Sequence, residues 1–284
     1  MLVAALIAGA AAAHATWNIT IKRAGTSGAG FLWATFVVGA VVFAPFGVAS
    51  LIEAGTDLSR WLPLAAVSGA LQVGYFFLLQ RAYRSADVSI VYPLARGTGP
   101  LLSVILAIVL LGERPGPIVL AGAALVVVGV IVIGMSSEQG KALVSRQGVL
   151  FGVLIGVVIA IYTLWDAAAV TIGDMPPVGL YWGSVVFQLL LVAATAIRGW
   201  SATLAVAREH WVAVLIVGIL APLAYILVLT AIQLAPVSVV APAREVSVVF
   251  VAIASWLILR EARPVQRLIG ATIVLAGVAL LALG

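Results

Sequence analysis

Cysteine is absent from this chain of 284 residues, and histidine occurs only twice. Without thiols the chain can form neither a disulfide bond nor a thiolate metal site, and neither His14 nor His210 has a partner at metal-ligand spacing. The motifs HExxH, GxSxG and GxxxxGK(S/T), which mark a zinc site, a serine nucleophile and a phosphate-binding loop, are missing too. We therefore predict that the protein is not an enzyme and that it holds no cofactor and no metal.

Charged residues are scarce as well: Asp, Glu, Lys and Arg make up 9% of the chain, whereas apolar residues make up 64%. A water-soluble fold of this length could not bury so much apolar surface, so we predict that the surrounding solvent is lipid. The formal net charge of +5 does not indicate nucleic acid, because Lys and Arg are scattered in ones and twos at the ends of apolar runs. The lipid bilayer is therefore an expected partner, and nucleic acid is not.

Ten apolar runs are long enough to cross the bilayer, because a helix needs about 20 residues to span roughly 30 Å of hydrocarbon. They are residues 2–21, 29–51, 61–83, 87–111, 116–135, 147–171, 177–198, 209–233, 236–259 and 264–283. Backbone polar groups in lipid must be satisfied within each segment, which at these lengths favours helices over barrel strands. We predict an all-α polytopic membrane protein with ten transmembrane helices and no soluble domain.

Basic residues are distributed unevenly among the connections between these spans. The odd-numbered connections carry Lys22, Arg23, Arg81, Arg84, Lys141, Arg146, Arg198, Arg208, Arg260, Arg263 and Arg267. The even-numbered connections carry only Arg60 and Arg114. Because basic loops stay on the cytoplasmic side, we predict that the odd-numbered loops are cytoplasmic and that both termini lie outside, in a bacterial inner (plasma) membrane.

The second half of the chain repeats the first. The pairs Arg96 with Arg244, Glu113 with Glu261, and Trp17 with Trp165 are each 148 residues apart. We predict two five-helix repeats, residues 1–140 and 141–284. Because five is odd, the second repeat enters the membrane from the opposite face and is inverted. Inverted repeats around a shared midplane site are typical of transporters that work by alternating access.

Each half also contains a helix with an internal proline, Pro93 or Pro242, followed by Gly-Glu-Arg-Pro at 112–115 or a close variant at 260–264. A ten-helix chain with these features resembles the EamA-type branch of the drug/metabolite transporter superfamily over essentially its whole length. The resemblance implies a secondary transporter, and many similar members export amino acids or related metabolites. Small proton-driven relatives carry an acidic residue in their first helix, where this sequence has His14 and Asn18.

Arg96 and Arg244 lie well inside the fourth and ninth spans. An arginine at the bilayer centre costs about 2.5–3.5 kcal/mol on insertion scales, so each is expected to face a polar cavity or a partner. One interpretation is that they bind the carboxylate of a substrate. The alternative is a structural lock, in which they pair with an acid such as Asp166 or with carbonyls freed by helix breaks at Pro93 and Pro242.

Aromatic and polar side chains in the spans suggest a mixed lining that suits a small amphipathic solute with a flat apolar part. The predicted substrate-binding residues are Trp17, Asn18, Tyr75, Tyr92, Arg96, Trp165, Tyr225 and Arg244. The candidates for proton coupling are His14, Asp166 and Glu245. Asp166 has a second interpretation, because it lies near the end of its span and an interfacial position would also explain it.

These observations favour a secondary active or facilitative transporter that exports amino acids, aromatic ones included, or related small metabolites by alternating access. A monomer would suffice, because one chain contains both inverted halves. The alternatives are a passive channel, a membrane scaffold or a membrane-embedded enzyme. An enzyme would need paired carboxylates or a nucleophile beside a base, and the acids in the spans, Asp166 and Glu245, have no sequence neighbour in such a role.

Overall fold

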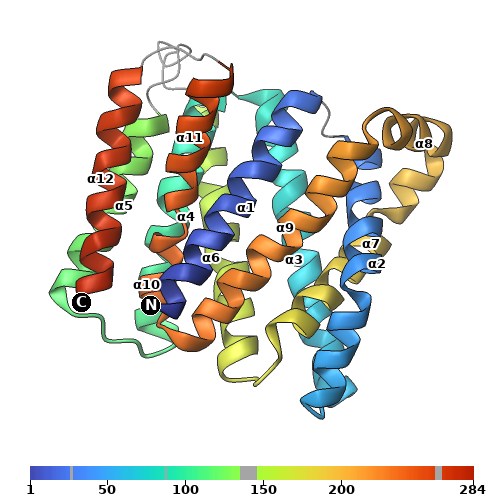
Figure 1. Cartoon of the computed structure of the whole chain (residues 1–284), viewed down its shortest axis with the longest axis horizontal. Helices are drawn as coiled ribbons and strands as arrows, with labels where there is room; N and C mark the ends of the chain where they lie inside the picture. Colours follow the sequence, from blue (N-terminus) through green and yellow to red (C-terminus); the bar gives the residue numbers. More distant parts are fainter. Residues whose placement is uncertain (26–27, 87, 135–145, 260–263) are drawn as a thin grey trace.

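The computed structural model describes the chain except for residues 26–27, 87, 135–145 and 260–263 (Figure 1). The helices of the described part are α1 (Leu2–Ala24), α2 (Ala29–Glu53), α3 (Leu58–Ser85), α4 (Val88–Leu110), α5 (Pro117–Gly134), α6 (Arg146–Thr171), α7 (Pro177–Arg198), α8 (Trp200–Glu209), α9 (Trp211–Leu234), α10 (Val237–Ala243), α11 (Val246–Leu259) and α12 (Pro264–Leu283). Each predicted apolar run is helical over nearly its full length. The prediction of an all-α polytopic membrane protein is confirmed.

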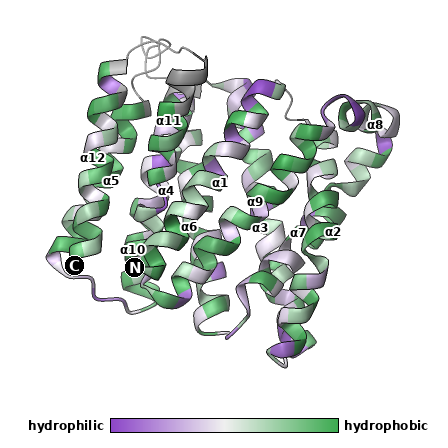
Figure 2. Ribbon diagram, in the orientation of Figure 1, coloured by the Kyte–Doolittle hydropathy of each residue, from purple (hydrophilic) through white to green (hydrophobic). Residues whose placement is uncertain are grey.

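The helices α1, α2, α3, α4, α6, α7 and α9 are long and apolar enough to cross a bilayer, while α5 and α12 contain shorter apolar stretches. Hydrophobic residues cover the helices along most of their length, as Figure 2 shows. Two details differ from the sequence-based prediction. The ninth predicted span is divided into α10 and α11, and the connection between the seventh and eighth spans contains the extra helix α8.

The two halves of the chain run in opposite directions. In Figure 1 the first helix of the first half, α1, rises from the end that holds both termini, whereas α6, its counterpart, descends towards that end. The even-numbered connections between the predicted spans lie at this end, which we call the even end. In helix labels they are α2–α3, α4–α5, α6–α7 and α9–α10. The opposite end is called the odd end. This arrangement is the inverted repeat that five helices per half predict.

Helices of the two halves alternate in the bundle rather than forming separate bodies. The helix α4 packs against α6, α1 against α9 and α11, and α2 against α7. The last helices of the halves, α5 and α12, also pack against each other. The residues that line the middle of the bundle therefore come from both repeats.

The α5–α12 contact depends on facing glycines. A Cβ atom added to Gly129 would lie 2.7 Å from the backbone nitrogen of Val274 and 2.8 Å from the carbonyl oxygen of Gly270. A Cβ on Gly270 would likewise lie 2.9 Å from the carbonyl oxygen of Gly129. Backbones this close leave no room for a side chain, which is how small residues allow membrane helices to associate.

We therefore expect Gly129→Val to separate α5 from α12 and to lower the stability of the protein by about 1–3 kcal/mol, the usual cost of overpacking. Thermal unfolding in detergent would measure the change. Gly74→Val in α3 is the matched control, because a Cβ on Gly74 would have no heavy atom within 4 Å. Equal melting temperatures for the two variants would show that the close contact contributes nothing.

Candidate functional site

The ninth span is broken where the sequence places an intramembrane arginine and glutamate. The helix α10 ends directly after Pro242, and α11 begins at Val246. Because proline has no N–H, one bond of the regular pattern is missing at Pro242. Tight turns replace it, with the N–H of Glu245 donating to the carbonyl of Pro242 at 3.0 Å and that of Ser247 to Arg244 at 3.1 Å. Arg244 and Glu245 therefore lie at a helix junction in the middle of the bundle.

The first half differs from the prediction of a second break. The helix α4 continues from Val88 to Leu110 through Pro93. Pro93 lies five residues after the helix start, as Pro242 does in α10, so a missing N–H does not by itself break this helix. The repeat-related arginine, Arg96, is thus carried by an intact helix.

Arg96 and Glu245 form an ion pair that joins α4 to the junction of α10 and α11. Nη1 of Arg96 lies 3.3 Å from Oε2 of Glu245, whose side chain is only 1% exposed. Nη2 of Arg96 lies 3.2 Å from Nε2 of His14 on α1. A guanidinium has only donors, so this nitrogen must accept and the imidazole is neutral. Asn18 donates its side-chain N–H to the carbonyl of His14 at 2.8 Å.

Arg244 is less completely paired. Its Nε lies 3.5 Å from Oε1 of Glu245, but this buried nitrogen makes no hydrogen bond with the described residues. Its Nη1 donates to the hydroxyl of Thr163 on α6 at 3.3 Å. The helix break lets Arg244 approach its neighbour Glu245, whereas in a continuous helix adjacent side chains point about 100° apart. The pairing of Arg244 with Asp166, one alternative from the sequence, does not occur.

We refer to Arg96, Arg244, Glu245 and His14 as the arginine cluster. It contains two cations and one anion, and its histidine is neutral, so its charges do not cancel. Uncompensated charge at membrane depth is costly and is tolerated where a polar space or a ligand balances it. The side chains of Arg96 and Arg244 are 19% and 12% exposed, so neither is completely enclosed by protein atoms.

A second polar group surrounds Asp166, which is fully buried. Its Oδ2 accepts hydrogen bonds from the hydroxyl of Tyr225 at 2.8 Å and from the amide of Gln72 at 3.4 Å. Further bonds connect Gln72 with Ser68, Ser184 and Gln188. We call these six residues the aspartate cluster. Its members come from α3, α6, α7 and α9, so both halves contribute.

Tyrosines connect the two clusters. The ring of Tyr162 on α6 makes edge contacts with Tyr75 at 5.9 Å and with Tyr225 at 6.0 Å between ring centroids. Tyr225 in turn contacts Tyr181 at 4.8 Å. Tyr162 adjoins Thr163, the partner of Arg244. One face of α6 therefore carries Thr163 and Asp166, one helical turn apart, with aromatic rings around them.

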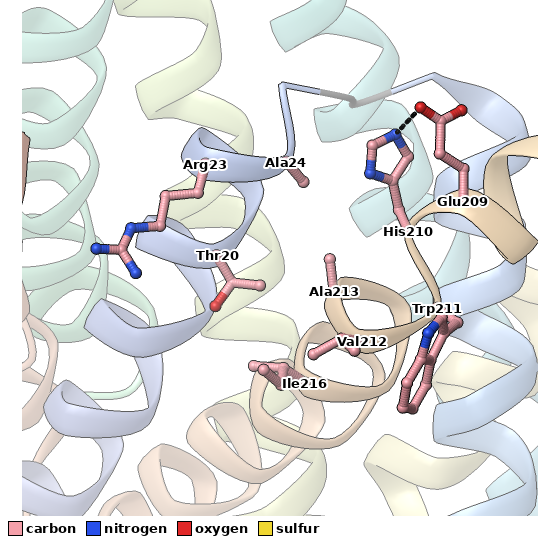
Figure 3. Close-up of a pocket in the computed structure, with 9 residues that line it drawn as sticks. All are labelled: Thr20, Arg23, Ala24, Glu209, His210, Trp211, Val212, Ala213 and Ile216. Atoms are coloured by element: carbon pink, nitrogen blue, oxygen red, sulfur yellow. Dashed lines mark ion pairs between the residues drawn. The ribbon is translucent and has the colours of Figure 1, made fainter.

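Two pockets at the odd end are lined by residues outside the arginine and aspartate clusters. One of about 390 Å³ lies between the end of α1 and the start of α9, as Figure 3 shows. Thr20, Arg23 and Trp211 are among the residues that line it, and Nε2 of His210 there lies 3.8 Å from Oε1 of Glu209. A smaller pocket of about 180 Å³ lies between α2, α7 and α8. In the described part of the chain, no three His, Asp or Glu side chains come together as metal ligands.

Comparison with known proteins decides the family. The model of the EamA-like transporter family matches residues 1–135 and 146–283, one segment in each half of the chain. The chain belongs to the EamA-like transporter family. This family, part of the drug/metabolite transporter superfamily, consists of transporters and not of enzymes, so the membrane and a small-molecule substrate are its partners.

A solved structure supports the fold of this EamA-like transporter. One solved crystal structure is similar to this chain with a TM-score of 0.78. The similarity covers 99% of this chain and 97% of the chain in that structure. The sequence identity is 20%, so the similarity concerns the fold alone. A comparison with curated proteins finds no match.

The predicted substrate-binding residues of the EamA-like transporter are brought together with one exception. Trp17 contacts the His14 ring edge-on at 4.9 Å, and the Tyr92 ring lies 5.7 Å from the guanidinium carbon of Arg96. Trp165 instead donates its indole N–H to the carbonyl of Leu64 on α3 at 3.1 Å. Its indole nitrogen therefore fastens α6 to α3 and binds to neither cluster.

Sequence reasoning missed the position of Glu113 in the EamA-like transporter. From the connection between α4 and α5, its carboxylate accepts the backbone N–H of Val237 at 2.7 Å and of Ser238 at 2.9 Å. These are the first N–H groups of α10, which have no partner within the helix. An anion there is favoured by the helix dipole as well. The repeat of Glu113 at Glu261 was the available signal, but Glu261 lies outside the described residues.

Proposed function

We propose that this EamA-like transporter exports amino acids, aromatic ones included, or closely related small metabolites, from the cytoplasm by alternating access between residues 1–140 and 141–284. The observation that supports this function is the unbalanced charge of the arginine cluster. Two guanidinium groups share the carboxylate of Glu245, and the Nε of Arg244 has no hydrogen-bond partner in the described part of the chain. A substrate carboxylate would supply the missing anion.

The position of Arg244 favours a substrate role over a purely structural one. Arg96 already has Glu245 and His14 at 3.2–3.3 Å, whereas the partners of Arg244 among the described residues are a neutral hydroxyl at 3.3 Å and a more distant carboxylate oxygen. Charge-assisted hydrogen bonds to a carboxylate are about twice as strong as neutral ones. We therefore assign Arg244 to the substrate carboxylate and Arg96 to the structure of the site.

The surroundings of Arg244 suit the rest of an amino acid. Thr163, its hydroxyl partner, is followed one turn later on α6 by the carboxylate of Asp166, which could bind an ammonium group. The rings of Tyr162 and Tyr225 lie beside this face and offer a flat apolar surface. A small zwitterion with an apolar side chain matches these three features together.

Counterflow in proteoliposomes tests the function directly. Purified protein is reconstituted into vesicles loaded with one unlabelled amino acid, and the uptake of the labelled form is followed. We expect exchange with phenylalanine, tryptophan or leucine to exceed that of protein-free vesicles, and to saturate. Uptake that never saturates would indicate a channel, and no exchange with any amino acid would refute the proposed substrate class.

A further inference from the structure

The sequence offers three side chains for proton coupling, and in the structure two of them, His14 and Glu245, contact an arginine. Nε2 of His14 accepts a hydrogen bond from Arg96 at 3.2 Å. A proton on Nε2 would turn this acceptor into a donor and place a second positive charge beside the guanidinium. Glu245 lies 3.3 Å from Arg96 and 3.5 Å from Arg244, and its protonation would leave both cations without an anion. Neither group can take up a proton without disrupting the arginine cluster.

Asp166 differs from both because its neighbours are neutral. The residue is fully buried, and its Oδ1 accepts no hydrogen bond from the described residues. The donors to its carboxylate among the described residues are neutral groups: the Tyr225 hydroxyl, the Gln72 amide and the Ser68 hydroxyl. No cationic side chain of the described ranges forms an ion pair with it. A buried carboxylate without a cation is costly, and either a proton or a cationic ligand removes that cost.

Among the described residues of the helices packed on α6, the charged groups on the side of Asp166 bond to partners other than Asp166. The titratable or charged groups on this side are Tyr225 on α9, Tyr181 on α7, Tyr75 on α3, Tyr162 on α6, Tyr92 and Arg96 on α4, and Arg244 with Glu245 at the junction of α10 and α11. The tyrosines are neutral near pH 7, because a phenol ionises near pH 10. Arg96 is paired with Glu245, and Arg244 bonds to Thr163 one turn away. Asp166 is thus the acid in this site that can change its charge alone.

We propose that Asp166 is the coupling site of the transporter, where a proton and the ammonium group of the substrate bind in turn to the same carboxylate. This inference rests on the proposed function, because it takes the substrate to be an amino acid. Without substrate, a proton from water at the even end forms an O–H bond with Oδ1. When substrate binds from the odd end, that O–H bond breaks, the proton passes to water there, and the ammonium replaces it. One proton therefore enters for each amino acid that leaves.

The spacing along α6 makes this exchange feasible. Thr163 and Asp166 are three residues apart, about 4.5 Å along a helix that rises 1.5 Å per residue. A substrate carboxylate on Arg244, beside Thr163, therefore sets its ammonium close to the face that carries Asp166. The substrate then balances Arg244 and Asp166 at once, whereas the proton balances Asp166 alone.

Transport by Asp166→Asn tests the coupling. Asparagine keeps the shape and an acceptor oxygen for Tyr225 but cannot exchange a proton. In wild-type proteoliposomes, one pH unit across the membrane should drive about tenfold accumulation, because one unit is about 1.4 kcal/mol per proton. In Asp166→Asn this accumulation ratio should fall to about one, and counterflow at equal pH should be slower than in the wild type, because the ammonium loses its carboxylate. The matched control is Asp174→Asn, because Asp174 is exposed and has a positive φ of 53°, which asparagine tolerates.

An infrared titration without substrate separates this inference from the proposed function. The wild type and Asp174→Asn should both gain the carbonyl band of a water-shielded carboxylic acid as pH falls, and Asp166→Asn should lack it. That result supports the proton site even if no amino acid is transported. Two results would overturn it: a wild type without this band, or pH-driven accumulation that survives in Asp166→Asn. Amino acid counterflow that ignores the pH gradient would overturn the coupling and leave the proposed function intact.

Discussion

Arg244→Met is expected to lower amino acid counterflow by at least about tenfold while the protein stays folded. Hydrogen bonds to a charged group contribute about 1.5–3 kcal/mol, and 1.4 kcal/mol corresponds to a factor of ten in binding. Methionine is similarly long and unbranched but has no charge. Its introduction leaves Arg96 and Glu245 as a balanced pair, so the fold should not suffer. Initial rates of counterflow, normalised to the amount of monodisperse protein, would measure the effect.

Two further variants locate the cause of this loss. Arg244→Lys keeps the positive charge but not the planar fork of the guanidinium, so it should retain part of the activity. Arg84→Met removes an exposed arginine from the last turn of α3 and should exchange amino acids at the wild-type rate. If Arg244→Met also worked at that rate, the guanidinium would have no part in substrate binding.

Glu245→Met is expected to destabilise the protein far more than Arg96→Met, although the two residues form one ion pair. Removing Glu245 leaves two buried cations without an anion, and breaking a buried pair in this way costs about 3–5 kcal/mol. Removing Arg96 leaves Glu245 with Arg244 at 3.5 Å, so the charges balance and the cost should stay under about 1.5 kcal/mol. Unfolding followed by circular dichroism in detergent would give both values.

The double variant Arg96→Met with Glu245→Met provides the internal check. It contains one cation in place of two cations and one anion, so its net charge equals that of the wild type. We expect it to recover part of the stability lost in Glu245→Met, which would make the two substitutions strongly non-additive. Similar losses for both single variants, with simple additivity in the double, would contradict the charge count of the cluster.

The fold was largely predictable because the bilayer imposes a simple length rule. A helix in hydrocarbon must be apolar for about 20 residues, and the runs at 147–171 and 177–198 coincide with α6 and α7 to within a residue. The helix α8 escaped prediction because its ten residues, Trp200–Glu209, are too few to span a membrane and were counted as a connection. Length alone does not report helices that lie outside the spans.

The site was predictable in composition but not in pairing. Arg96, Arg244, Glu245 and Asp166 stand out because charge inside a span is rare, and all four lie in the two clusters. Which of them pair depends on the junction at Pro242, because a break turns Arg244 towards Glu245. Pro93 lies as far from the start of α4 as Pro242 does from the start of α10, and yet α4 stays intact. The presence of a proline near the helix start was therefore not enough to predict which of the two helices breaks.

The bonds from Glu113 to the first turn of α10 have a consequence for the carrier's resting equilibrium. They fasten the α4–α5 connection of the first half to the second half at the even end, where Trp61 also donates to the carbonyl of Gly179 at 3.0 Å. A movement that separated the two halves at this end would have to break the bonds from Glu113 to Val237 and Ser238. Hydrogen bonds to a charged group contribute about 1.5–3 kcal/mol each, so these two favour the arrangement in which the halves are joined there.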